Sequence, residues 1–450
     1  MNDILAEMDD GKPYWRVNLV VVWISQFVSM VAFSISLPFG PFYIRELLMK
    51  SGGCAPDELE TRVKLCAALS LSIASAMVAV MAPIWGMLAD RFGRKQMLIR
   101  ANFGAGTMLF LMSFAPNVEI FLLYRGLQGI FSGTNSAALT MVSGCTPRSR
   151  QGFALGLLTA AIYSGDMTGQ FIGGILAEKY GYQMTFTTSA LILAFSAFLV
   201  LFLAKEDHIR VIAEKASNAA RGLKGMMTYV WPCMPIYAVI LLIGISRIFD
   251  NSQFPLLVEL LNGGKDVPGK EVWTGRVAGL ASIGAMASGI IIGRLIDRFN
   301  PAHTASFAAL GAGLSMLAIG LLPFLFMDCG RLSGEFCLLG HSFRESVTIP
   351  VLTLMPLRFI MVFCSAGLEP VTNVWLSKIT QAEHRGIVLG WAVTARYLGS
   401  TIGPMTGGFV SMTYGVRALY FVGPWLLLLL VPLFQIVQLR LRRQFAISPK

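Results

Sequence analysis

The chain has 450 residues, of which 55% are hydrophobic and 14% are charged, and its mean hydropathy is +0.65. This apolar surface exceeds what one water-soluble core can bury, so the composition excludes an ordinary soluble domain and favours helices that face lipid. The formal net charge of +11 suggests a nucleic-acid-binding protein, but the placement of the basic residues excludes that interpretation.

Runs of about 20 apolar residues match a bilayer core of about 30 Å, and they predict twelve transmembrane helices. The predicted spans are 16–40, 66–88, 97–114, 118–143, 153–177, 184–204, 233–256, 274–292, 303–325, 356–376, 387–410 and 417–438. The N-terminal segment is acidic, the wrong charge for a secretory signal peptide, so we expect no cleaved leader.

Lysines and arginines are distributed unevenly between the two sides of these spans. Of the 36, 21 lie in loops on the side of the N-terminus, 11 lie on the opposite side and 4 lie within spans. Cytoplasmic loops retain basic residues during membrane insertion, so this bias predicts that both termini are cytoplasmic. We therefore expect a multi-pass protein of the inner or plasma membrane, with no nucleic-acid partner.

The longest predicted cytoplasmic loop divides the spans into six and six. It covers residues 205–232 and separates an N-terminal bundle, 1–204, from a C-terminal bundle, 233–450. Two predicted outer loops, 45–65 and 327–355, are also long. The sequence therefore predicts two helical bundles joined by one linker.

The outer loops contain two cysteine pairs, Cys54 with Cys66 and Cys329 with Cys337. Each pair is either a disulfide or two thiols, and spacing alone leaves both alternatives open. The chain has only four histidines and no nucleotide-binding G-x-x-x-x-G-K-[S/T] motif. We expect no metal site, no cofactor and no catalytic residues, so the sequence favours a carrier over an enzyme.

One pattern occurs twice at a constant offset of 234 residues. Leu155, Gly156, Ala161, Tyr163, Gly165, Gly169, Gly173, Gly174, Tyr180 and Gly181 return as Leu389, Gly390, Ala395, Tyr397, Gly399, Gly403, Gly407, Gly408, Tyr414 and Gly415. A second, shorter repeat relates Gly86–Phe92 to Gly293–Phe299. Internal repeats in hydrophobic segments are typical of transporters built from two pseudo-symmetric bundles around a central site.

The loop after the second span reads G-M-L-A-D-R-F-G-R-K, from Gly86 to Lys95. It resembles the signature G-x-L-A-D-R-x-G-R-K of the major facilitator superfamily, and the resemblance extends over essentially the whole chain. It implies an all-α membrane fold of twelve helices and a monomeric secondary transporter. The implied cytoplasmic gate residues are Gly86, Asp90, Arg91, Gly93 and Arg94; the alternative is a basic loop that only sets topology.

The fourth span contains Arg125 within L-L-Y-R-G-L-Q-G, which is similar to the family's R-x-x-Q-G motif. In the drug:proton antiporter branch, this arginine is associated with proton transfer. A charge in mid-membrane costs about 2.5–3.5 kcal/mol on insertion scales, so Arg125 must make compensating interactions. The alternative is a structural arginine, because Arg358 lies near the equivalent place in the second half.

Glycine motifs in the fifth and eleventh spans resemble G-x-x-x-G-P-x-x-G-G of the same antiporter branch. The matching residues are Gly165, Gly169, Gly173, Gly174, Gly399, Gly403, Pro404, Gly407 and Gly408. Glycines spaced by four residues allow close helix contact, so helix packing is the simpler explanation. Gln170 replaces the motif's proline, so the fifth span departs from the motif at the position where proline would kink the helix.

Asp166 lacks a counterpart in the repeat, where Ser400 occupies the equivalent position. It lies in a polar stripe with Thr159, Tyr163 and Gln170, at helical spacing on an otherwise apolar span. In lipid such a stripe must face a cavity or another helix. We therefore predict that Asp166 carries the coupled proton.

The sequence offers further candidates for proton coupling and for the substrate cavity. Arg125 is a possible modulator of the proton site, followed by Glu369 and Asp250 as alternative acids; Asp250 has Arg247 nearby as a local ion-pair partner. Cavity candidates are Gln26, Phe33, Tyr163, Gln170, Asn373 and Trp391.

The predicted function is proton-coupled export of small amphipathic compounds. Two alternatives remain: a proton-coupled carrier of one metabolite, such as a sugar or an organic anion, and a membrane receptor or scaffold that does not transport. We expect protons, a small-molecule substrate and the lipid bilayer as partners.

Overall fold

A computed structural model describes residues 14–52, 55–147, 150–205, 230–265, 267–325, 331–338, 341–380 and 385–445. We call residues 14–205 the amino half and residues 230–445 the carboxyl half. The amino half contains α2 (Trp15–Ser36), the 3-10 turn η1 (Leu37–Phe39), α3 (Gly40–Ser51), α4 (Pro56–Phe92), α5 (Arg94–Ser113), α6 (Val118–Phe131), α7 (Thr134–Cys145) and α8 (Gln151–Leu203).

The carboxyl half repeats this succession of long helices. It contains η3 (Trp231–Cys233), α11 (Met234–Ile248), α12 (Phe254–Leu261), α13 (Lys270–Arg298), α14 (Pro301–Leu325), β1 (Arg331–Leu338), β2 (His341–Thr348), α15 (Ile349–Ala366), α16 (Leu368–Ile379), α17 (Arg385–Tyr414), η5 (Val416–Ala418) and α18 (Leu419–Phe445). Most of the predicted linker, 205–232, lies outside the described residues.

All twelve predicted spans lie on helices, so the prediction of a helical membrane fold is confirmed. Among the described residues, eight helical stretches are long and apolar enough to cross a membrane. One of them, Phe153–Leu203, contains two predicted spans, because the chain turns at Gly181 inside α8. Gly181 has a φ of 78° and its repeat partner Gly415 a φ of 84°, a left-handed conformation that favours glycine, so the same turn occurs in both halves.

Five segments differ from the sequence prediction. The seventh span is broken between α11, which ends at Ile248, and α12, which begins at Phe254, and the tenth is broken at Gly367 between α15 and α16. The fourth span is two helices, α6 and α7, separated at Ser132 and Gly133. The first helix continues through η1 into α3, where Pro38 and Pro41 interrupt regular hydrogen bonding. The predicted loop 327–355 contains an antiparallel hairpin, with Arg331 opposite Thr348 and Leu338 opposite His341, so the fold is not purely helical.

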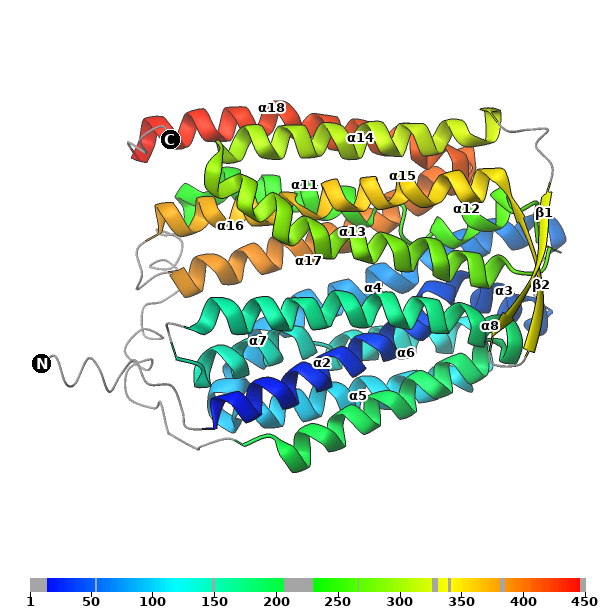
Figure 1. The fold of residues 1–450 in the computed structure, drawn as a ribbon, viewed down its shortest axis with the longest axis horizontal. Helices are drawn as coiled ribbons and strands as arrows, with labels where there is room; N and C mark the ends of the chain where they lie inside the picture. The colour runs from blue at the N-terminus through cyan, green and yellow to red at the C-terminus, as the bar shows by residue number, and fades with distance from the viewer. Residues whose placement is uncertain are drawn as a thin grey trace, which may run out of the picture.

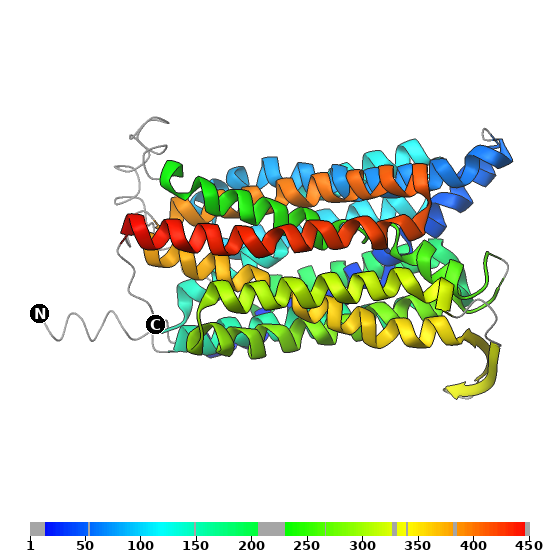
Figure 2. The ribbon, with the colours of Figure 1, turned by 90° about the horizontal axis from the view of Figure 1, so that it is seen from above.

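The long helices run side by side along one axis (Figures 1 and 2). In Figure 1 the start of α2 and the end of α18 lie at the left, and the β1–β2 hairpin lies at the right. We call these the termini end and the hairpin end. Each half has its own core: one buried apolar cluster belongs to the carboxyl half, and two others belong almost entirely to the amino half.

The outer surface of the bundle is apolar. Phe202, Phe307 and Trp425 are 76%, 74% and 71% exposed, respectively, which is unfavourable in water and favourable against lipid tails. The apolar residues that the composition showed to be too numerous for one core are therefore placed both inside the two halves and around their outside.

The repeated glycines pack each half internally. A Cβ atom added to Gly165 would lie 2.5 Å from the carbonyl oxygen of Phe27, and one at Gly169 or Gly173 would collide with the α2 backbone in the same way. In the carboxyl half, Gly399, Gly403 and Gly407 contact the α11 backbone in the equivalent manner. Helix α8 is therefore tightly packed against α2, and α17 against α11.

The fourth glycine of each motif faces the other half. A Cβ added to Gly174 of α8 would lie 2.8 Å from the carbonyl oxygen of Glu271 in α13, and one added to Gly408 of α17 would collide with Ala68 in α4. Gly275 of α13 in turn leaves room for the backbone of Gln170. The glycine motif thus makes both the contacts within each half and the close contacts between halves.

Candidate functional site

A cavity of about 550 Å³ lies between the two halves. Its walls come from α2, α4, α6, α7 and α8 of the amino half and from α11, α12, α13, α15 and α17 of the carboxyl half. Among the described residues, four charged side chains line it: Arg125, Asp166, Arg247 and Arg358. A polar cavity between two bundles is the expected place for the substrate of a pseudo-symmetric transporter.

Asp166 is held by serines from both halves. Ser34 of α2 donates a hydrogen bond to Oδ1, and Ser282 of α13 donates one to Oδ2 at 2.6 Å. Within the described residues, no lysine or arginine forms an ion pair with this carboxylate. Asp166 is therefore a cavity acid whose described hydrogen-bond partners are two hydroxyl groups.

The other two candidate acids form ion pairs with arginines. Glu369 contacts Arg247 at 2.5 Å and Arg396 at 3.5 Å. Asp250 is fully buried, accepts a hydrogen bond from Tyr420 at 2.9 Å and pairs with Arg358. A carboxylate paired with arginine is stabilised in its charged form and is a poor carrier of a transported proton.

The predicted local pairing of Asp250 with Arg247 is wrong, because each residue binds a partner from a distant helix. Arg247 forms an ion pair with Glu369 of α16, and Asp250 forms one with Arg358 of α15. The first pair joins α11 to α16, and the second joins the turn after α11 to α15, so both pairs lie within the carboxyl half.

Arg125 is 6% exposed and donates a hydrogen bond to Gln128, one turn later in α6. No described carboxylate pairs with it. The next glycine of the motif, Gly129, allows α6 to approach the backbone of Ala74 in α4. The R-x-x-Q-G sequence thus combines a buried cation, its hydrogen-bond acceptor and a close helix contact.

The predicted cavity residues divide into two groups. Phe33, Tyr163 and Gln170 line the cavity. Gln26 is buried in the amino half and donates to Asn135, whereas Asn373 and Trp391 are exposed and do not line this cavity. The three that line it come from the first and fifth predicted spans; of the polar stripe in the fifth span, Thr159 is exposed and does not line the cavity.

The predicted gate lies between α4 and α5 at the termini end. Gly93, with a φ of 98°, separates α4, which ends at Phe92, from α5, which begins at Arg94. Lys95 donates to the carbonyl oxygen of Ala204 at 2.7 Å and so ties this junction to the end of α8. The surroundings of Gly86 and the side chains of Asp90 and Arg91 lie outside what the structure describes, so the gate stays a prediction.

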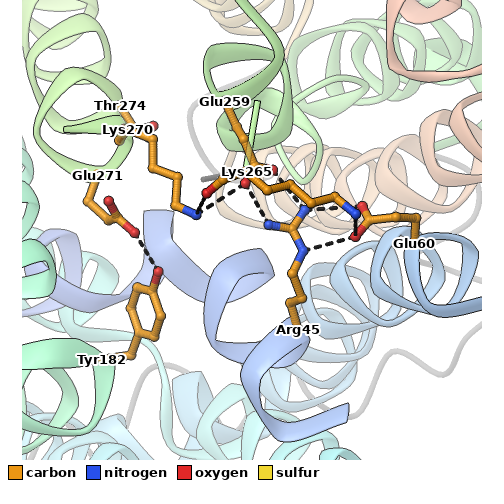
Figure 3. A network of polar contacts seen from close by, with 8 residues as sticks. All are labelled: Arg45, Glu60, Tyr182, Glu259, Lys265, Lys270, Glu271 and Thr274. Atoms are coloured by element: carbon orange, nitrogen blue, oxygen red, sulfur yellow. Dashed lines mark hydrogen bonds and ion pairs between the residues drawn. The ribbon is translucent and has the colours of Figure 1, made fainter. Parts of the chain in front are cut away.

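At the hairpin end, charged side chains from both halves form one cluster that sequence analysis missed (Figure 3). We call it the inter-half cluster; it consists of Arg45, Glu60, Glu259, Lys265 and Lys270. Arg45 binds both carboxylate oxygens of Glu259, at 2.6 and 2.7 Å, and both residues are almost fully buried. Bidentate arginine–carboxylate pairs are among the strongest polar contacts in proteins.

Of the other contacts in the inter-half cluster, one crosses the boundary between the halves and one lies within the carboxyl half. Lys265 of the carboxyl half contacts Glu60 at 2.7 Å, and Lys270 contacts Glu259 at 3.2 Å. Beside the cluster, Tyr182 donates to Glu271 at 2.6 Å (Figure 3). The two halves are therefore joined at the hairpin end in this structure.

Comparisons with known proteins agree with this architecture. The family model described as Major Facilitator Superfamily matches residues 22–334 and 329–445. A multidrug resistance protein MdtG from Klebsiella pneumoniae (strain 342) is 29% identical over 408 residues, covering 91% of this chain and 90% of the relative. The protein of the same name from Escherichia fergusonii is 27% identical over 417 residues, covering 93% of each chain.

Solved structures with the same architecture are more distant in sequence. A bacterial homologue of the human lysosomal transporter Spinster, in an inward-facing and occupied conformation, has a TM-score of 0.70 at 13% identity, covering 98% of this chain and 100% of that one. The D-xylose-proton symporter has a TM-score of 0.68 at 14% identity, covering 92% and 96%. At these identities the likeness concerns the fold alone.

Proposed function

Because the chain belongs to the Major Facilitator Superfamily, we propose that it exports small amphipathic compounds in exchange for protons. The observation that carries the proposal is Asp166, a carboxylate in a cavity between the halves with no basic partner among the described residues. The relatives named multidrug resistance proteins support export of drug-like compounds. The predicted spans and basic loops support an integral membrane protein.

Proton coupling requires an acid that changes its charge during the cycle. Burial favours the neutral form of a carboxyl group, and hydrogen-bond donors favour its charged form. Asp166 has such donors in this structure, whereas Glu369 and Asp250 form ion pairs with arginines. Asp166 is therefore the proposed proton carrier, with Arg125 as a cation that lines the same cavity.

Alternating access follows from two halves that rock about the cavity. The bias of basic loops toward the termini end supports a cytoplasmic position for that end, with the hairpin end outside. In this orientation the structure corresponds to a state closed on the outer side by the inter-half cluster. The G-M-L-A-D-R-F-G-R-K loop is the proposed gate on the cytoplasmic side.

Everted membrane vesicles provide the direct test of exchange. We expect that tetraphenylphosphonium, an amphipathic cation, dissipates a preformed pH gradient only in vesicles that contain the protein, because each molecule taken up releases luminal protons. The measurement is the fluorescence of a pH-gradient dye, and vesicles without the protein are the control. Failure of every amphipathic probe to release protons would favour a receptor or scaffold.

The cavity also supports a second candidate, a carrier of organic anions. Three arginines and one acid line it, and Arg125 has no carboxylate partner among the described residues. An anionic group on the substrate would complement Arg125. The same vesicle assay with anilinonaphthalene sulfonate, an amphipathic anion, distinguishes the two: proton movement with this probe and not with the cation favours the anion carrier.

Loss of Glu259 should loosen the hairpin end. Glu259→Gln removes the bidentate partner of the nearly buried Arg45, which keeps Glu60 at 3.0 Å. Removing one member of a buried ion pair costs about 3–5 kcal/mol when the other charge is left unpaired, and Glu60 reduces that cost here. Even part of that free-energy cost destabilises the closed state relative to the open one. We therefore expect the cavity to become accessible from the hairpin side about tenfold more often. The measurement is the rate at which an impermeant maleimide labels Ser70→Cys, which lines the cavity.

Glu46→Gln is the matched control for this variant. Glu46 lies on the same helix, α3, and pairs with Lys50 of that helix, so its loss breaks an ion pair that does not join the halves. We expect no change in labelling of Ser70→Cys. Equal labelling in the Glu259 and Glu46 variants would show that the inter-half cluster does not control access.

A further inference from the structure

We propose that Ser282 is the positioning residue that makes proton binding by Asp166 depend on the conformation of the transporter. This inference rests on the proposed role of Asp166 and adds a contact that would change its proton affinity between the two states of the transporter. Ser282 belongs to α13 of the carboxyl half, whereas Asp166 belongs to α8 of the amino half. Their 2.6 Å hydrogen bond therefore crosses the boundary along which the halves must move.

The hydroxyl of Ser282 is positioned as a donor to the carboxylate. Gln170 donates a hydrogen bond to Ser282 Oγ at 3.4 Å. Ser282 Oγ has two acceptors within reach: the Asp166 carboxylate at 2.6 Å and the carbonyl oxygen of Ala278 at 3.3 Å, so the carboxylate is the closer one. A hydroxyl has one proton to donate, so this chain of contacts directs it to Asp166. Gln170, which replaces the proline of the glycine motif, thus supports the proton site.

The two serines on Asp166 differ in how they move. Ser34 lies on α2, which Gly165, Gly169 and Gly173 pack against the α8 backbone, so α2 and α8 move as one body. Ser282 lies on the far side of the boundary between halves. Separation of α8 and α13 by about 1 Å at this point stretches a 2.6 Å hydrogen bond beyond bonding distance and leaves the Ser34 bond intact.

No other charged group takes over this role in the described part of the chain. The charged and titratable side chains that share the cavity with Asp166 are Arg125 of α6, Arg247 of α11, Arg358 of α15, Tyr163 of α8 and Tyr397 of α17. None of these arginines forms an ion pair with Asp166, and two are occupied by Glu369 and Asp250. The α2 and α13 contacts to the carboxylate are the two serines.

The direction of the switch matches export driven by protons. In the state seen here, closed at the hairpin end, two donors favour the charged carboxylate and therefore proton release toward the termini side. When the hairpin end opens, α13 withdraws, one donor is lost, and the carboxyl group binds a proton from the outer side more readily. One hydrogen bond thus biases Asp166 to load on one side and unload on the other.

The test compares Ser282→Ala with Ser34→Ala in everted vesicles, using tetraphenylphosphonium or anilinonaphthalene sulfonate, whichever moves protons with the wild-type protein. The pH is varied separately in the medium, which faces the termini end, and in the lumen. For Ser282→Ala we expect the medium-side profile to shift by about one pH unit to alkaline values, a tenfold effect, and the lumen-side profile to stay unchanged. For Ser34→Ala both profiles should shift together.

Three outcomes overturn the inference: an unchanged medium-side profile in Ser282→Ala, equal shifts on both sides, or identical behaviour of the two variants. Ser282→Thr keeps a hydroxyl and should retain the wild-type profile. If Ser282→Ala does not fold, Ser282→Cys, a weaker donor, should shift the same profile by less, and no shift would contradict the inference. Asp166→Asn tests the proton carrier separately. If this variant still couples transport to proton movement, Asp166 is not the proton carrier, and the proposed function fails independently of the result for Ser282.

Discussion

Asp166→Asn should abolish uphill export and retain downhill exchange. Asparagine has nearly the same size, and its carbonyl oxygen accepts from one of the two serines while its NH2 group donates to the hydroxyl of the other, but it does not titrate. One proton moving through a potential of about 100 mV supplies about 2.3 kcal/mol, which supports a concentration ratio of roughly 50-fold. We expect this ratio to fall to about one in vesicles energised by a pH gradient, with exchange of labelled for unlabelled substrate continuing.

The control for this experiment is Asp166→Glu, which keeps a titratable group and should retain part of the uphill export. Exchange without a gradient shows in the same vesicles that Asp166→Asn is folded and binds substrate. Wild-type accumulation by Asp166→Asn would place proton coupling at another acid, with Glu369 and then Asp250 as the next candidates.

Gly169→Ala should strongly destabilise the protein. The added Cβ would collide with the carbonyl oxygen of Val31 and also approach Ser34, and backbone atoms cannot move aside as a flexible side chain can. Inserting an atom into a packed interface costs typically 1–3 kcal/mol, and a backbone collision lies at the upper end. We expect a lower yield of folded protein in detergent and a clear fall in its thermal unfolding temperature.

Gly156→Ala is the matched control because it makes the same change in the same helix. No atom lies within 4 Å of a Cβ built at Gly156, and the residue is exposed. Alanine is favoured over glycine in a helix by about 1 kcal/mol, so this variant should unfold at the wild-type temperature or above it. Equal stability of the two variants would show that the glycine motif does not fix the distance between α2 and α8.

Much of the fold could be predicted because it depends on local patterns. The repeat at offset 234 predicted two equivalent halves, and the structure places the same left-handed turn at Gly181 and Gly415. The absence of a repeat partner for Asp166 identified a polar residue that lines the cavity. The β1–β2 hairpin was missed, because a predicted outer loop carries no helical periodicity from which its structure could be inferred.

The sequence by itself determined which segments are helices, which faces are apolar and which residue types occur within the spans, because these follow from hydropathy and spacing along one helix. Only the tertiary structure decided the partners: Arg45 with Glu259, Asp250 with Arg358, and Asp166 with Ser282. These contacts join segments more than 100 residues apart. Their geometry depends on the rotation and register of packed helices, which close glycine contacts set and which no local pattern encodes.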